Sequence, residues 1–227
     1  MKKYVIKLSG ESLTGENNLD FNKCLDVAMS LKKIYEKDIR LLIVIGGGNF
    51  WRGRSNTNMN SEVSDYVGML ATEMNALVLN EALKQVNCPS KVFLRYNVPC
   101  SNEYNDDLLA SSIDNNILIV GGGTGKPGFS TDTGAALAAK AINADLIIKM
   151  SKTDGVYDSD PFKNINAKKY DKLSFDEVIL KKLEIMDLTA FEICKENSIK
   201  ILVAKMDNLL KIINIDELNG TIISNEG

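Results

Sequence analysis

The chain contains no histidine among its 227 residues. This absence excludes Ser-His-Asp triads, Cys-His pairs, phosphohistidine intermediates and most zinc sites. Direct phosphoryl transfer is not excluded, because that reaction needs positioned charge rather than a histidine that moves a proton.

Cysteine is scarce, and its positions show no pattern. The four cysteines are Cys24, Cys88, Cys100 and Cys194, and none forms a C-x-x-C pair. The spacing therefore gives no support for a zinc site or a redox centre. We expect reduced and mostly buried thiols in a cytoplasmic protein.

Long apolar runs and a strong excess of one charge are also absent. No run approaches the length of a membrane span, and the apolar stretch after Met1 is broken at once by Lys7, Ser9 and Glu11. This pattern does not fit an export signal. The formal net charge of −3 argues against broad binding to nucleic acid or membrane.

Short apolar, β-branched runs recur along the chain at 4–8, 41–45, 92–94, 117–120, 146–148 and 201–203. Most are continuous rather than alternating, as expected for parallel strands covered on both faces. Helical patterns lie between them, at 21–32, 67–78, 131–142 and 187–197. The alternation predicts one α/β domain over residues 1–227, with a doubly wound, mostly parallel sheet sandwiched by helices.

Two of these predicted strands run into glycine-rich segments. Gly46-Gly47-Gly48 follows the strand at 41–45, and the segment from Gly121 to Asp132 follows the strand at 117–120. We expect each segment to lead into a helix, so that backbone N–H groups and a helix dipole favour an anion. Two phosphate-sized sites at one sheet edge suit a donor and an acceptor, which is the layout of a kinase.

The glycine segments do not match the common nucleotide motifs. A P-loop ending at Gly125-Lys126 would need a glycine at Val120 and a hydroxyl at Pro127. The spacing Gly123-x-Gly125-x-x-Gly128 fits a dinucleotide fingerprint, but the helix begins too late and the next acid opens a strand. Neither motif therefore explains the glycine segments.

Charged side chains accompany the predicted strand ends. Lys7 ends the first strand, Arg52 follows the first glycine triplet, Asp65 lies just before an amphipathic helix, and Asp132 opens another. Each alone has an ordinary explanation as a solvated end, a surface cation or a helix-start acid. Together they indicate a phosphate-binding centre.

The whole set of motifs resembles the bacterial uridylate kinases of the amino acid kinase family. The matching segments, in that family's order and spacing, are residues 7–11, 45–53, 65–72, 122–132, 152–161 and 186–190. The segments at 68–72 and 186–190 together are specific to this branch, whereas other amino acid kinases share mainly the first strand, the glycine triplet and the loop at 154–157.

The resemblance implies transfer of the ATP γ-phosphoryl group to UMP, with Mg²⁺, in pyrimidine nucleotide biosynthesis. It implies an N-terminal lobe, to about residue 125, that mainly serves UMP and subunit contacts. The C-terminal lobe, from about residue 126, would mainly serve ATP. Relatives of this kind are typically homohexamers that often respond to GTP as activator and UTP as inhibitor.

The resemblance also implies roles for individual residues, although it assigns no metal ligand directly. The residues expected at the reaction centre are Lys7, Asp132, Asp187 and Lys149, the last with a structural lysine as the alternative. Asp132 and Asp187 are expected to organise this centre by holding lysine and metal rather than by acting as bases. Those expected on the ATP side are Lys7, Leu8, Ser9, Gly10, Gly48, Arg52, Ser151, Tyr157 and Asp160. Those expected to hold UMP are Gly47, Asp65 (on the ribose), Thr124, Gly125, Lys126, Pro127, Gly128, Phe129, Ser130 and Thr131.

Three positions depart from the pattern of these kinases. Lys126 replaces the usual asparagine, Gly128 a bulky residue, and Ala138 an arginine. The first two lie in the segment assigned to UMP, so the resemblance implies the reaction type more firmly than the base selectivity. Gly134 is expected to weaken its helix by about 1 kcal/mol relative to alanine.

Two alternatives stay open at this point. The chain is another amino acid kinase acting on a carboxylate or carbamate, or it is a non-catalytic nucleotide-binding or sensing protein of the same fold. The branch-specific segments count against the first alternative. Lys7, Asp132 and Asp187 count against the second.

Overall fold

The computed structural model describes residues 1–16, 19–53, 58–96 and 98–227. Within these ranges the chain forms a nine-stranded sheet in the order β4-β3-β5-β2-β1-β6-β10-β11-β9. Its strands are β1 (Lys3–Leu8), β2 (Arg40–Ile45), β3 (Ser90–Leu94), β4 (Asn102–Glu103), β5 (Ile117–Val120), β6 (Leu146–Ser151), β9 (Lys172–Ser174), β10 (Lys200–Lys205) and β11 (Gly220–Ser224). All pairs of neighbouring strands in this sheet are parallel except the pair formed by β10 and β11, which is antiparallel. The strands β7 (Val156–Tyr157) and β8 (Lys169–Tyr170) form a separate antiparallel ribbon.

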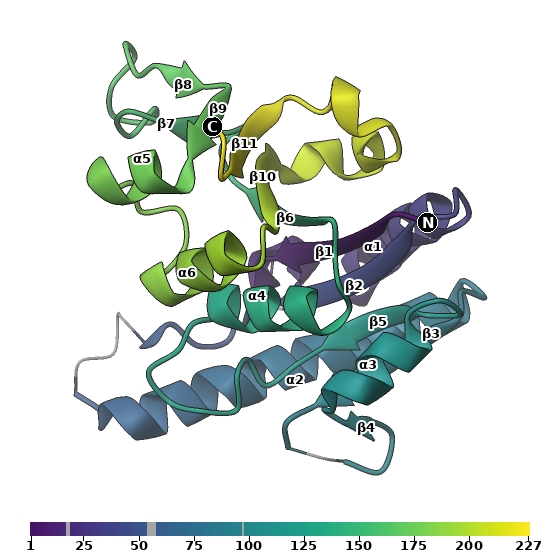
Figure 1. Cartoon of the computed structure of the whole chain (residues 1–227). Coiled ribbons are helices and arrows are strands. Elements are labelled where there is room, and N and C mark those ends of the chain that lie inside the picture. Colours follow the sequence, from purple (N-terminus) through teal and green to yellow (C-terminus); the bar gives the residue numbers. More distant parts are fainter. Residues whose placement is uncertain (17–18, 54–57, 97) are drawn as a thin grey trace.

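Helices cover both faces of the sheet (Figure 1). One face carries α1 (Phe21–Tyr35), α2 (Ser61–Gln85) and a 3₁₀ segment (Met206–Glu217). The other carries α3 (Asp106–Ser112), α4 (Thr131–Ala141), α5 (Phe175–Leu180) and α6 (Leu188–Glu196). This arrangement confirms the predicted doubly wound sheet sandwiched by helices.

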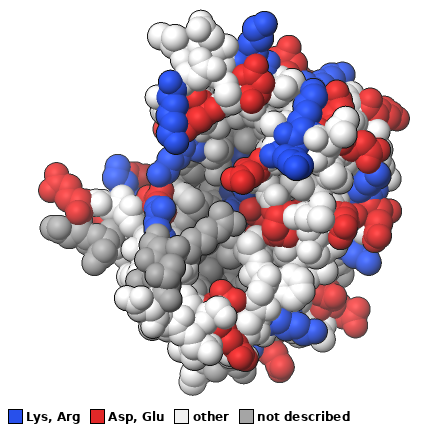
Figure 2. Space-filling view, turned by 90° about the vertical axis from the view of Figure 1, so that its left-hand side faces the viewer, with Lys and Arg blue, Asp and Glu red and all other residues white. Residues whose placement is uncertain are grey.

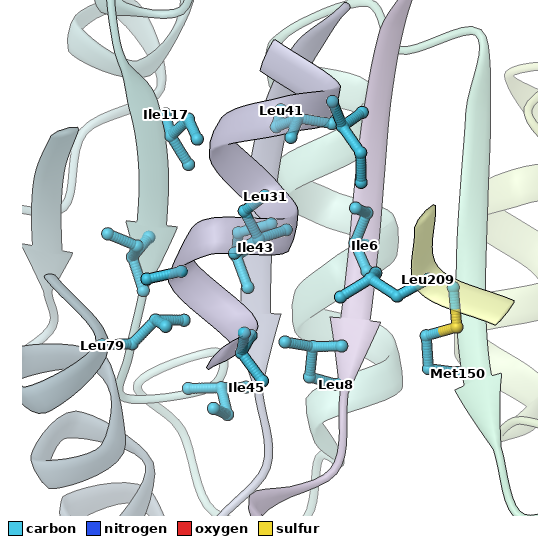
Figure 3. Close-up of a cluster of buried hydrophobic side chains, with 14 of the residues drawn as sticks. Ile6, Leu8, Leu31, Leu41, Ile43, Ile45, Leu79, Ile117, Met150 and Leu209 are labelled. Carbon is cyan, nitrogen blue, oxygen red and sulfur yellow. The ribbon is translucent and has the colours of Figure 1, made fainter. Parts of the chain in front are cut away.

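The strands are apolar throughout because successive side chains enter different cores. Ile6 and Leu8 of β1 pack with Leu31 of α1 in one cluster (Figure 3). Val5 of the same strand packs in the second cluster, with the alanines of α4. Burial on both faces explains the continuous apolar runs in the sequence.

The predicted helix beginnings need two corrections. Helix α2 begins at Ser61 and is capped by Asn60, so Asp65 lies inside the helix and not before it. The first glycine triplet therefore does not lead directly into a helix; Gly47 instead begins a turn closed by the amides of Phe50 and Trp51. The second glycine segment does lead into a helix, α4, whose cap is Ser130.

Gly134 also has a different role from the expected one. It is buried in α4, and a Cβ on it would lie 3.3 Å from the backbone of Gly123. The helix uses this glycine to pack closely on the glycine-rich loop, so a cost measured in an exposed helix does not apply.

The cysteines behave as expected. Cys24, Cys88 and Cys194 are buried, Cys100 is exposed, and all four are free thiols. Burial raises the pKa of Cys24 and Cys88 to about 11 and that of Cys194 to about 12. Among the described helices, none is long and apolar enough to cross a membrane.

Candidate active site

The carboxyl ends of β1, β2, β5 and β6 meet at one edge of the sheet, because these neighbouring strands are parallel. Open α/β sheets bind ligands outside such an edge. Figure 2 views the molecule from this side and shows a hollow with acidic and basic side chains around it. The charged residues predicted from the sequence converge here.

A lysine–aspartate–lysine cluster lies at the centre of this edge. Lys7 of β1 and Lys149 of β6 are register partners on adjacent strands. Asp132, in the first turn of α4, lies 3.0 Å from Lys7 Nζ through Oδ1 and 2.7 Å from Lys149 Nζ through Oδ2. The three side chains are 14%, 16% and 12% exposed for Lys7, Lys149 and Asp132.

With all three groups ionised, the cluster carries one more positive than negative charge. Burial opposes ionisation of Asp132, but Lys7 and Lys149 outweigh it and hold the pKa of this carboxyl below its ordinary value. Burial lowers the pKa of Lys149, and the facing Asp132 only partly restores it. Lys149 also donates to the carbonyl of Ile185. The cluster is therefore a preformed cationic centre, whose carboxylate is a poor base.

Asp187 has a different setting from Asp132. It caps α6 by accepting from Ala190 N at 2.9 Å, and it accepts from Thr133 Oγ1 at 2.7 Å and from Ser130 Oγ. We expected Asp132 and Asp187 to hold lysine and metal; Asp132 does contact lysines, whereas Asp187 joins the start of α4 to the start of α6.

The glycine-rich loop before α4 is attached to the polar edge of α2. Gly122 N donates to Thr72 Oγ1 at 2.7 Å, and Gly128 N donates to Asp65 Oδ2 at 2.7 Å. Gly122, Gly123, Gly125 and Gly128 have positive φ, which glycine adopts without the strain that a side chain would add.

The first glycine triplet is held to the same helix. Asn75 Nδ2 donates to Gly46 O at 2.8 Å. A Cβ on Gly47 would lie 2.8 Å from Gly68 O and from Ala71 Cβ, so the loop packs directly on α2. A Cβ on Gly48 would meet nothing within 4 Å. The polar residues of α2 therefore position both glycine segments.

A single cavity and a pair of adjoining cavities flank the lysine–aspartate–lysine cluster. The first, which we call the α2 pocket, has a volume of about 300 Å³ and is lined by Gly47, Trp51, Gly53, Ser64, Asp65, Gly68, Met69, Thr72, Gly123, Phe129, Ser130 and Thr131. The second, the β6 cleft, comprises adjoining cavities of about 500 and 640 Å³ that share Lys149 and Ser151. Lys7 and Lys149 line the β6 cleft, and Asp132, which pairs with both, directly follows Thr131 of the α2 pocket, so the cluster links residues that line the two.

An ion-pair bridge lies near the β6 cleft. Glu11 pairs with Arg52 and, at 3.0 Å, with Lys152. Arg52 Nε also donates to Gly48 O at 3.2 Å. Both cations are more than half exposed, which leaves them accessible to a soluble anion.

The structure brings most of the predicted site residues together. Those lining the β6 cleft are Lys7, Ser9, Lys149, Ser151, Tyr157 and Asp160. Those lining the α2 pocket are Gly47, Asp65, Phe129, Ser130 and Thr131. Thr124 and Lys126 instead line a separate cavity. Gly125, Pro127 and Gly128 lie in the loop between these cavities without lining either of them.

Three predicted donor-side residues contribute differently. Leu8 is fully buried in the core, so only its backbone is available to a ligand. Gly10 is also buried, and a Cβ there would lie 2.6 Å from Gly46 O, so its role is close packing of two loops. Gly48 lines none of the cavities described above.

Sequence reasoning missed the polar edge of α2. Thr72, Glu73 and Asn75 are all buried and lie within one turn of α2, between the apolar residues Ala71 and Ala76. Polar residues placed between apolar ones in this way are a usable signal, because polar groups that become buried need partners.

Comparison with known proteins agrees with this geometry. Residues 2–205 match the amino acid kinase family. A uridylate kinase of Mycoplasmopsis synoviae is 41% identical, with 99% of this chain and 97% of the relative covered. A uridylate kinase of Bacteroides thetaiotaomicron is 39% identical, with coverage of 99% and 98%.

Solved structures give the same grouping. The crystal structure of UMP kinase from Ureaplasma parvum has a TM-score of 0.91 at 34% identity and covers 98% of both chains. UMP kinase from Bacillus anthracis has a TM-score of 0.93 at 29% identity, with coverage of 100% of this chain and 97% of that one. The chain belongs to the amino acid kinase family and, within it, to the uridylate kinases.

Proposed function

We propose that this protein transfers the γ-phosphoryl group of ATP to UMP, giving UDP and ADP, as a step of pyrimidine nucleotide biosynthesis. The observation that carries the proposal is the net positive Lys7–Asp132–Lys149 cluster between two cavities. A loose phosphoryl-transfer transition state spreads negative charge over its equatorial oxygens, and preformed cations stabilise that charge. The relatives named uridylate kinase supply the identity of the acceptor.

The β6 cleft is the proposed donor site. Lys7, the backbone from Leu8 to Gly10, Gly48 and Arg52 would face the ATP phosphates. Ser151, Tyr157 and Asp160 would contact the nucleoside. Among the described residues, no group of three or more cysteine or acidic side chains is arranged to hold a metal, and Asp132 is already paired with two lysines. Mg²⁺ would therefore enter as part of the MgATP substrate.

The α2 pocket is the proposed acceptor site, with the Thr124–Thr131 loop as one wall. Asp65 Oδ2 already accepts from Gly128 N, which leaves its second oxygen for a ribose hydroxyl. The phosphate of UMP would lie between Gly47 and Thr131, toward the lysine cluster. Asp132 would hold the two lysines in place and would not act as a base, because its pKa is lowered.

Replacing Asp65 with alanine is expected to raise the KM for UMP by about tenfold or more, because it removes a charge-assisted hydrogen bond to substrate and the anchor of Gly128. The KM for ATP should stay within about twofold of wild type. Initial-rate kinetics with each substrate varied in turn would measure both constants. Equal rises in both values would contradict the assignment of Asp65 to the acceptor.

The two-lobe division, the homohexamer, the GTP and UTP responses and the cytoplasmic location stay predictions. An apolar stripe on α2 supports the assembly: Val63, Leu70 and Met74 are 50%, 49% and 46% exposed and follow helical spacing. A stripe of this kind on a helix is typical of a buried interface in an oligomer.

The variant Leu70→Asp is therefore expected to reduce the assembly to smaller species. Burying a carboxylate in an apolar contact is unfavourable without a cation partner. Light scattering coupled to size-exclusion chromatography would report the mass. Leu180→Asp, which changes a leucine 82% exposed on α5, is the matched control and should leave the mass unchanged. Assembly of Leu70→Asp at wild-type mass would exclude this face.

A coupled assay of ADP formation tests the proposed reaction against its alternatives. It offers UMP, CMP, dUMP, aspartate, glutamate and carbamate in parallel, each with MgATP. Turnover on UMP and little on the carboxylates or carbamate is the expected result. Turnover on a carboxylate or carbamate would assign a different amino acid kinase activity, and ATP binding without turnover on any acceptor would indicate a binding protein.

A further inference from the structure

Glu73 is a buried carboxylate that the proposed reaction does not use. It lies on α2 and is only 5% exposed, and no lysine or arginine of the described residues forms an ion pair with it. Burial raises its pKa, against the effect of two backbone N–H groups that favour the charged form. Burying a carboxylate without a cation partner is unfavourable for folding. The contacts of Glu73 therefore indicate its role.

Those contacts fix the turn that follows β3. Glu73 Oε1 accepts from Arg95 N at 3.0 Å and from Tyr96 N at 2.9 Å. Consecutive backbone N–H groups of this kind form an anion-binding nest. Glycine-rich segments follow β2 and β5. At the end of β3, the two N–H groups instead bind the carboxylate of Glu73.

Arg95, held by this anchor, packs against the glycine-rich loop. A Cβ on Gly122 would lie 2.6 Å from Arg95 Cβ and Cγ, and a Cβ on Gly125 would lie 3.2 Å from Arg95 Cδ. Arg95 Nε donates to Gly123 O at 3.4 Å. Its guanidinium carbon lies 3.3 Å from the centroid of the Tyr104 ring, a cation–π contact that restricts the head group.

This contact reaches the loop from outside the acceptor site. Arg95 lines a separate cavity of about 380 Å³, together with Thr124, Lys126 and Phe129, and it does not line the α2 pocket. Arg95 can therefore hold the loop without touching an acceptor bound in the α2 pocket.

We propose that Glu73 and Arg95 are positioning residues that set the affinity for the acceptor nucleotide. Glu73 fixes the backbone of residues 95 and 96, and Arg95 supports Gly122, Gly123 and Gly125, so that the later part of the loop, Phe129 to Thr131, is held at the α2 pocket. The proposal rests on the assignment of the α2 pocket to UMP. A small displacement of a segment that positions a substrate has a large kinetic effect. Displacement of this loop would raise the KM for the acceptor rather than the KM for ATP.

Steady-state kinetics of matched variants test the proposal. Arg95→Ala and Glu73→Leu are expected to raise the KM for UMP by about tenfold, with the KM for ATP within about twofold of wild type. Glu73→Gln keeps an oxygen that accepts both N–H bonds and should retain a near wild-type KM for UMP. Arg40→Ala removes another arginine that lies over a tyrosine, Tyr35, from the opposite end of β2, and should change neither KM.

Hydrogen exchange of the loop amides gives a readout that does not depend on activity. The amides of Gly122, Gly125 and Gly128 are hydrogen-bonded in the free protein. Arg95→Ala should accelerate their exchange without changing that of β1, β2 and β6. If Arg95→Ala does not fold, Arg95→Lys, which keeps the aliphatic stem, takes its place and should show the same effects at smaller size.

An unchanged KM for UMP and unchanged loop exchange in Arg95→Ala would overturn the proposal. Equal rises in both KM values, with faster exchange throughout the sheet, would also overturn it, because they would indicate a general structural role. Absence of UMP turnover in the wild type would contradict the proposed function instead, and the exchange experiment would still test the support of the loop by Arg95.

Discussion

Replacing Lys7 with alanine is expected to lower kcat by about a hundredfold to a thousandfold, the loss typical of removing one donor to the transition-state charge. Lys7 is one of the two cations of the central cluster, and its ammonium is already fixed 3.0 Å from Asp132 before any substrate binds. Such a preformed cation needs no reorganisation when charge develops on the transferring phosphoryl group. Turnover at saturating ATP and UMP would measure the loss.

A matched control for this prediction exists on the same strand. Lys3 begins β1, whereas Lys7 lies near its carboxyl end, so Lys3→Ala removes a lysine at the opposite edge of the sheet. It should keep wild-type turnover. Both variants should show wild-type circular dichroism. Near-normal turnover in Lys7→Ala would place the reaction centre elsewhere.

Replacing Asp132 with asparagine is expected to reduce both activity and stability. The substitution leaves Lys7 and Lys149 facing each other without their shared carboxylate, and loss of one member of a buried ion-pair set costs about 3–5 kcal/mol. The lysines would also lose the geometry that serves the reaction, so kcat should fall as well. Urea unfolding and steady-state kinetics would measure the two effects.

The stability difference between wild type and Asp132→Asn should depend on pH. The pKa of Asp132 in the folded protein lies below the ordinary value of 3.8, so its carboxylate stabilises the fold fully above that value. The contribution is lost as the pH falls from about 3.8 through the lower folded pKa. Asp145→Asn, which changes an acid bonded to Lys3 N at the other sheet edge, is the control. An equal loss in both variants would contradict a special role for Asp132.

The part of the site that could be predicted from the sequence is the part encoded locally. Lys7, the two glycine segments and Asp132 each follow a recognisable apolar run or open a recognisable helix, and parallel strands bring such ends to one edge. The pairing of Lys7 with Lys149 depends on β1 lying beside β6, an order of strands that local pattern does not contain.

The expectations that the structure corrects, and the features that the sequence did not reveal, depend on weak local signals or on contacts between residues far apart in the chain. The sequence pattern predicts Asp65 before its helix because the apolar periodicity begins later than the cap at Asn60. The role of Gly134 depends on a contact with Gly123, and that of Glu73 on the turn after β3. The strands β4, β7, β8 and β9 have two or three residues each, too few to produce a periodic signal.

Binding of an adenosine–uridine compound joined by five phosphates would test most directly whether the α2 pocket and the β6 cleft meet at one reaction centre. Such a molecule spans donor and acceptor sites, so the second contact becomes intramolecular and the affinity should exceed that for ATP by about a hundredfold or more. Calorimetry should give one molecule per chain, with weaker binding to both Lys7→Ala and Asp65→Ala. Affinity no higher than that of ATP, with UMP still able to bind, would show that the two cavities do not form a single phosphoryl-transfer site.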